Sequence, residues 1–134
     1  MVNFEFFDHT ADVKFRAYGK DLEEAFSNAA LATFQVMTEV SKVKDLEEKE
    51  IFVKSSSNEA LLFDFIDELI FLLDTEGFLL SKVNKLSIKN GELHAIISGD
   101  NADNYDVHTY VKAPTYNEMQ INKDPVWVQL VLDL

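Results

Sequence analysis

The last eight residues, Trp127 to Leu134 (WVQLVLDL), constrain the fold more than any other stretch of the chain. Five of them are aliphatic and one is tryptophan, a composition that suits a central strand covered on both faces. A chain end is usually frayed and polar, so an apolar end has to pack inside the protein. The sequence therefore predicts a β-sheet in which the C-terminal strand is buried.

The other strands are predicted from alternating side chains and turn residues. Val13, Phe15 and Ala17 alternate with longer polar side chains, which is the period of a half-buried strand. Asn90-Gly91 favours a type I′ hairpin turn between two strands. The predicted strands are 3–7, 13–18, 78–88, 92–98, 107–113, 118–122 and 126–132. Residues 51–53 are the apolar part of another strand, and 42–50 is either a loop or the start of that strand.

Two helices are predicted between these strands. The first runs from residue 22 to about 38, with Asp21 as N-cap and Glu24 in an acidic variant of the capping box. The second opens at Ser56, with Glu59 three residues on, and ends before Glu76-Gly77. We therefore expect a single α+β domain over residues 1–134, with two helices packed on antiparallel or mixed sheet.

Composition and charge limit the classes of function. The chain has 134 residues, 47% of them hydrophobic, and no cysteine, which suits a folded protein of the reducing cytoplasm. No apolar run reaches the length of about 18 residues that a membrane span needs. The net charge of −12 provides no basic stripe for phosphates, so little direct RNA binding is expected. Basic proteins and divalent cations remain suitable partners.

The segment Asp8-His9-Thr10-Ala11-Asp12 (DHTAD) gathers polar side chains at the mouth of the first predicted hairpin. Asp and Thr are common turn residues because their side chains bond nearby backbone amides. On this interpretation the segment is a turn and the chain terminus, with Asp133, is solvated, so that neither binds a ligand.

A metal site is the alternative reading of the same residues. Asp8 or Asp12 could combine with Asp133 and the α-carboxylate of Leu134, which an ordered terminal strand would hold in place. Three carboxylates would form a hard oxygen site suited to calcium or magnesium. His9 could bind a softer ion such as zinc, although an imidazole that orients the loop by hydrogen bonding is the better interpretation. The residues alone do not show that position 12 meets position 133.

Motifs along nearly the whole chain resemble those of the archease family. They are DHTAD at 8–12, LEEAF at 22–26, ALLF at 60–63 with Asp67-Glu68 after it, KAPTY at 112–116 and the closing VLDL at 131–134. The resemblance implies that Asp12, Asp133 and Leu134 bind a divalent metal, calcium first, with magnesium or manganese as alternatives. It also implies a functional role for Lys112, which otherwise reads as a solvated lysine at a strand end.

The resemblance further implies that this protein is not an enzyme itself. Archeases assist the GTP-dependent RNA-splicing ligase of tRNA exon ligation by promoting guanylylation of the ligase and its multiple turnover. An older proposal for the family is a chaperone or specificity modulator of a tRNA methyltransferase. From a different class, a stand-alone metal-dependent phosphohydrolase or nuclease remains an alternative. Asp8 and His9 are further candidate functional residues, and the oligomeric state is not predicted.

Overall fold

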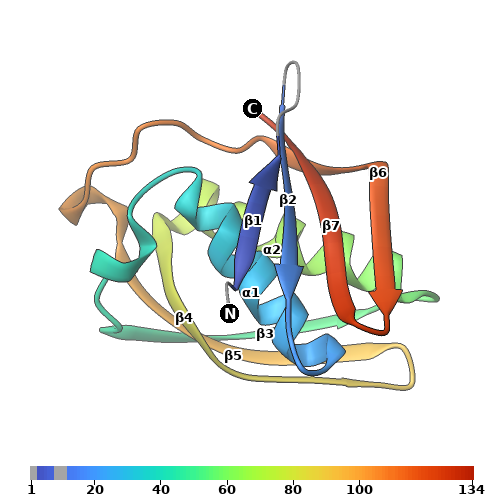
Figure 1. Cartoon of the computed structure of the whole chain (residues 1–134). Helices are drawn as coiled ribbons and strands as arrows, with labels where there is room; N and C mark the ends of the chain where they lie inside the picture. The colour runs from blue at the N-terminus through green and yellow to red at the C-terminus, as the bar shows by residue number, and fades with distance from the viewer. Residues whose placement is uncertain (1–2, 8–11) are drawn as a thin grey trace.

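The computed structural model describes residues 3–7 and 12–134, where two helices lie between two β-sheets (Figure 1). The strands are β1 (Phe4–Phe7), β2 (Val13–Tyr18), β3 (Glu47–Lys54), β4 (Phe78–Lys89), β5 (Glu92–Asn101), β6 (Ala113–Lys123) and β7 (Val126–Asp133). The helices are α1 (Leu22–Gln35) and α2 (Asn58–Glu76), with short 3-10 helices at Val40–Lys42 and Ala102–Asn104. This arrangement confirms the predicted α+β class.

The strands form a four-stranded sheet in the order β1-β2-β7-β6 and a three-stranded sheet in the order β3-β5-β4. Neighbouring strands are antiparallel in both sheets. β7 lies between β2 and β6, and its Val128, Leu130 and Leu132 are fully buried. The prediction of a buried C-terminal strand is therefore confirmed, whereas the division into two sheets was not predicted.

Helix α1 begins as the sequence predicts. Asp21 is its N-cap, and its carboxylate accepts a hydrogen bond of 2.8 Å from the backbone N–H of Glu24. The Glu24 side chain accepts in return from the backbone N–H of Lys20. The helix packs against β2 and β7 on one side and β4 on the other. Because α1 is held from both sides, it fixes the position of β2 and β7 relative to the rest of the core.

Helix α2 begins one residue later than predicted. The N-cap is Ser57, not Ser56, and its Oγ accepts from the backbone N–H of Ala60. The helix ends at Gly77, which has a φ of 67° in the left-handed region that glycine tolerates best. Its buried face packs on β6 and on the three-stranded sheet, and one hydrophobic cluster joins both helices and both sheets.

Two strand predictions need correction. Residues 107–112 do not form a strand, because the backbone there contacts the segment that follows α1: the backbone N–H of His108 donates to the Met37 carbonyl at 2.9 Å. The strand predicted at 118–122 is longer, since β6 already begins at Ala113. The start of β3 at Glu47 falls within 42–50, where the sequence allowed either a loop or the start of this strand.

The helices of the described segments were also compared with the requirements of a membrane span. In residues 3–7 and 12–134, neither α1 nor α2 is both long enough and apolar enough to cross a membrane.

Candidate functional site

Asp12 and Asp133 lie at adjoining ends of two paired strands. β2 and β7 are paired antiparallel up to the pair Val13–Leu132, and one further step along each chain reaches Asp12 and Asp133. Side chains alternate between the faces of a strand, so Asp133, next to the buried Leu132, lies on the outer face of the four-stranded sheet, and Asp12 comes immediately before β2. Figure 1 shows the C-terminus beside the start of β2. The chain fold thus brings together two residues far apart in the sequence.

Leu134 and Lys112 border the same corner. The Leu134 side chain is partly buried and packs against the core, which holds the last residue of the chain in place. The backbone N–H of Lys112 donates to the Asp133 carbonyl at 2.8 Å, and β6 then pairs with β7 from Ala113 opposite Asp133. The Lys112 side chain is exposed. Backbone pairing therefore places Lys112 next to Asp133.

The remaining sequence-predicted residues cannot be placed. Asp8 and His9 lie outside the described residues, which end at Phe7 and resume at Asp12. Among the described residues, no group of three or more His, Cys, Asp or Glu side chains is arranged to hold a metal ion. The described side chains thus provide two carboxylates at this corner, from Asp12 and Asp133.

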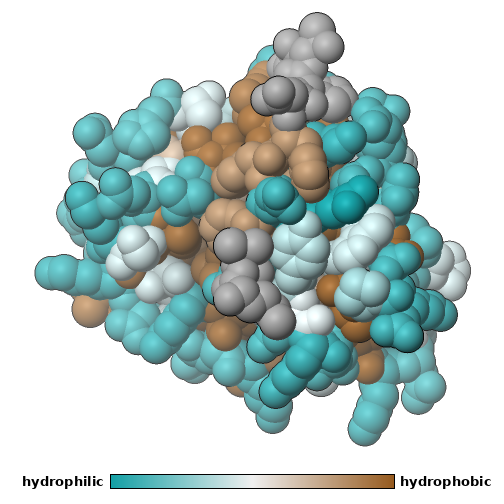
Figure 2. Space-filling view, in the orientation of Figure 1, coloured by the Kyte–Doolittle hydropathy of each residue, from teal (hydrophilic) through white to brown (hydrophobic). Residues whose placement is uncertain are grey.

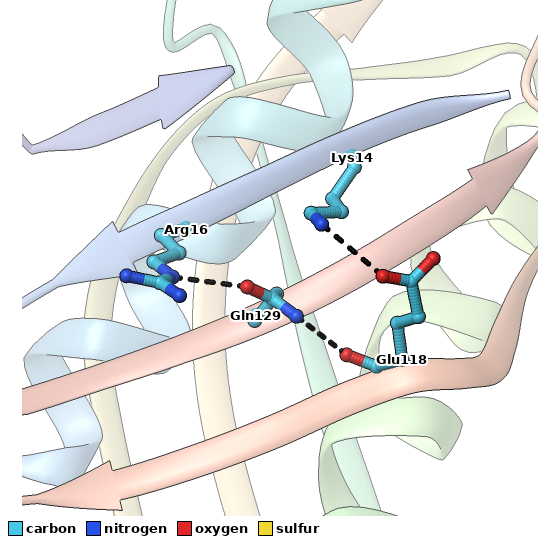
Figure 3. A network of polar contacts seen from close by, with 4 residues as sticks. All are labelled: Lys14, Arg16, Glu118 and Gln129. Carbon is cyan, nitrogen blue, oxygen red and sulfur yellow. Dashed lines mark hydrogen bonds and ion pairs between the residues drawn. The ribbon is translucent and has the colours of Figure 1, made fainter. Parts of the chain in front are cut away.

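A network of polar side chains lies next to this corner on the outer face (Figure 3). Lys14 on β2 reaches across β7 and pairs with Glu118 on β6, with 3.2 Å between Nζ and Oε1. Gln129 on β7 accepts from the Arg16 Nε at 2.9 Å and donates through its Nε2 to the Glu118 carbonyl at 2.7 Å. The network ties β2, β7 and β6 together across their outer face.

Arg16, the chain's single arginine, also packs on aromatic rings. Its guanidinium lies 4.1 Å from the Trp127 ring centroid and 5.2 Å from that of Phe7. Such stacking stabilises the cation and reduces the freedom of its side chain. The buried Gln129, which is only 2% exposed, therefore meets a well-positioned donor. The outer face near the corner thus carries two cations, Lys14 and Arg16, each held by contacts to neighbouring strands.

Glu118 reaches this network because β6 is irregular. The register with β7 shifts between Thr115 and Gln120, and Glu118 has a φ of 57° in the left-handed region. Bulges of this kind re-aim side chains and are frequent next to functional sites. Sequence analysis missed this residue, since no glycine or proline marks the bulge. The alternation of Lys14 and Arg16 along the second predicted strand was the only available signal for the network.

Figure 2 looks onto the outer face of the four-stranded sheet. Hydrophobic surface occupies the upper middle of this view and is surrounded by mostly hydrophilic residues. Phe6 of β1 is 43% exposed because β1 is an edge strand, although its pairing with the buried Phe15 places it on the inner face. An apolar area at one edge of a polar sheet face is compatible with contact to another protein.

Together, the fold and this corner define a small α+β protein with a carboxylate pair at the end of a buried terminal strand. The sequence profile described as Archease protein family (MTH1598/TM1083) matches residues 4–134. The chain belongs to this family.

Individual relatives agree with the family match. The protein archease of Methanothermobacter thermautotrophicus is 41% identical, with 100% of both chains covered. The protein archease of Sulfurisphaera tokodaii is 45% identical over 90% of this chain and 89% of that protein. The predicted family membership is thereby confirmed.

Two solved structures share the fold. The solution structure of Methanobacterium thermoautotrophicum protein 1598 has a TM-score of 0.76 and 36% identity, covering 98% of this chain and 99% of that one. A crystal structure of an archease from Thermotoga maritima, described as a possible chaperone, has a TM-score of 0.57 and covers 96% of this chain and 94% of its own. At 19% identity the second likeness concerns the fold alone.

Proposed function

We propose that this protein is an accessory factor that activates the GTP-dependent RNA-splicing ligase, which joins RNA ends bearing a 2′,3′-cyclic phosphate and a 5′-hydroxyl. In this role it promotes guanylylation of the ligase and its multiple turnover in tRNA splicing. Membership of the archease family supports the proposal. The observation that carries it for this chain is the strand register that leads to Asp12 and Asp133 at one corner.

The corner has the chemistry of a divalent-cation site. Asp12, Asp133 and the α-carboxylate of Leu134 would hold the metal, for which calcium is our first choice and magnesium or manganese the alternatives. Hard cations prefer oxygen ligands, and the chain has no cysteine that would favour a softer ion. The packing of the Leu134 side chain against the core supports its inclusion, since a frayed terminus would be a poor ligand.

The charge distribution suits an accessory role. A bound cation would supply neutralisation of charge on phosphate oxygens during nucleotidyl transfer. Lys112, beside Asp133, would add a positive group at the same corner. The overall charge of −12 favours docking on a basic, RNA-binding protein in the cytoplasm and disfavours competition for RNA phosphates.

A multiple-turnover ligation assay tests this function. The ligase, GTP, divalent metal and RNA with the two end groups are mixed with and without the protein. We expect the protein to raise the number of ligation events per ligase molecule, and Asp133→Asn to lose much of this effect. Asp74→Asn, at an exposed position near the end of α2, is the matched control for loss of one carboxylate. Unchanged ligase turnover with the wild-type protein contradicts the proposal.

Two further assays, one of the protein without ligase and one of tRNA methylation, separate the alternatives. RNA or nucleotide cleavage by the protein without ligase favours a stand-alone metal-dependent phosphohydrolase. A change in the site or rate of tRNA methylation, with ligation unaffected, favours the role of methyltransferase chaperone or specificity modulator.

A further inference from the structure

A groove on the surface, away from the corner described above, is bounded by strand β3 and helix α2. Its volume is 340 Å³, and it is lined by Phe52, Val53, Asp64, Asp67, Glu68 and Phe71. We refer to it as the α2 groove. Phe52 and Phe71 are 63% and 56% exposed, although large aromatic side chains are normally buried.

The helix contributes to the α2 groove through a single stripe. Asp64, Asp67, Glu68 and Phe71 follow the spacing i, i+3, i+4, i+7, which aligns side chains on one face of a helix. The opposite face of α2 is buried in the core. Because α2 is anchored by that buried face, the stripe is presented on a rigid element and does not depend on a loop.

All of the charged side chains that line the α2 groove are acidic. Asp64 is held by the Ser55 Oγ, which donates to its Oδ2 at 2.6 Å. Burial raises the pKa of Glu68, and the nearby Asp67 and Glu76 raise it further. A nearby cation would stabilise the ionised form of such a carboxylate, because burial has removed part of its hydration.

We infer that the α2 groove binds a segment of a partner protein in which an aliphatic or aromatic side chain lies next to Lys or Arg. The apolar side chain would lie between Phe52 and Phe71, and the basic side chain would meet Asp67 and Glu68. Aromatic side chains, phenylalanine included, are enriched in protein–protein interfaces. This surface is separate from the carboxylate corner, so the inference does not depend on the metal or the ligase.

Charge complementarity selects this occupant over a second copy of the chain. Two copies would each carry a charge of −12 and would bring their acidic stripes together, which opposes association. A stable dimer also needs about 800 Å² of buried surface on each partner, much more than two phenylalanine side chains provide. A basic segment satisfies both the apolar and the acidic parts of the groove.

The test uses a short synthetic peptide in which Lys and Leu alternate. Its binding to the ¹⁵N-labelled protein is followed by NMR, which reports both affinity and location. We expect shifts concentrated at residues 52–53 and 64–71. The double variant Phe52→Ser/Phe71→Ser should weaken binding about tenfold or more, and Asp67→Asn should weaken it less. Leu46→Ser, which removes an exposed apolar side chain elsewhere, should leave binding unchanged.

Three results would overturn the inference. The first is equal binding of a peptide with Ser in place of Leu, since charge alone would then explain the contact. The second is a set of shifts away from the α2 groove. The third is self-association of the protein that the double variant abolishes, which would assign the groove to a second copy. Thermal melts of each variant confirm that it is folded before its affinity is compared.

Discussion

Val13 pairs with Leu132 across β2 and β7, and this pair determines where the residues Asp12 and Asp133 lie. A shift of β7 by one residue would move Asp133 to the opposite face of the sheet, because side chains alternate with a period of two. The register is held by the buried side chains of both strands and by the Arg16–Gln129 hydrogen bond. The buried side chains and this hydrogen bond thus act together to hold the ends of β2 and β7 side by side.

The first prediction concerns cation binding at this corner. Asp12→Asn and Asp133→Asn each keep the shape of the side chain but remove one negative charge. Since affinity for hard cations follows the charge of the ligands, each variant should bind calcium about tenfold or more weakly than the wild type. Calorimetric titration with calcium and then magnesium measures this. Asp74→Asn should bind as the wild type does, and an equal loss there would assign the effect to overall charge.

The second prediction concerns the network on the outer face. Arg16→Ala removes the donor to Gln129, whose side chain is only 2% exposed, and the stacking on Trp127. A buried polar group without its partner costs about 1–3 kcal/mol, so the free energy of unfolding should fall by about that amount. Arg16→Lys should restore only part of it, because the ammonium group lacks the planar fork of the guanidinium. Urea denaturation gives these values, with Lys89→Ala at an exposed strand end as control.

The third prediction is a dependence of stability on pH through Glu68. Its pKa in the folded protein is raised, chiefly by burial, above the ordinary value of 4.5. The folded state therefore binds the proton more tightly than the unfolded chain, and stability falls as pH rises above 4.5 through the folded pKa. Glu68→Gln removes this loss, so it should be the more stable protein at about pH 7 by less than about 1 kcal/mol. Thermal melts should show the difference shrinking towards about pH 4, and a constant difference would contradict the assignment.

The fourth prediction compares two glycines. A Cβ added at Gly99 would lie 2.0 Å from the Leu79 carbonyl oxygen, so β5 and β4 could not keep their present spacing. Gly99→Ala should destabilise the protein by about 3 kcal/mol. At Gly77 a Cβ has room, and alanine there meets only the cost of a positive φ, about 1 kcal/mol. The melting temperature should therefore decrease more in Gly99→Ala than in Gly77→Ala.

The sequence predicts elements well where local chemistry decides them. Asp21 caps α1 because its short carboxylate reaches the free backbone N–H of Glu24, three residues later in the first turn. The apolar composition of β7 allowed burial to be predicted, since an exposed strand of that kind would be unstable in water. The turn at Asn90-Gly91 also forms, with positive φ at both residues.

The remaining features depend on contacts between distant residues. Ser56 and Ser57 are chemically equal as caps, so the choice between them follows from how α2 packs. Residues 107–112 have the composition of a strand, but the backbone N–H of His108 bonds to Met37 just after α1. The bulge at Glu118 carries no local signal, and the meeting of β2 with β7 could be inferred only from the family resemblance.

Guanylylation of the ligase is the measurement that tests the central proposal most directly. The ligase is incubated with radiolabelled GTP and divalent metal, and its labelling rate is measured with wild-type protein, Asp133→Asn, Asp74→Asn or a protein extended beyond Leu134. Extension converts the α-carboxylate of Leu134 to a neutral amide and adds bulk at the corner. We expect faster labelling with the wild type and Asp74→Asn, and little stimulation by Asp133→Asn and the extended protein. Equal stimulation by the wild type, Asp133→Asn and the extended protein would contradict the proposal.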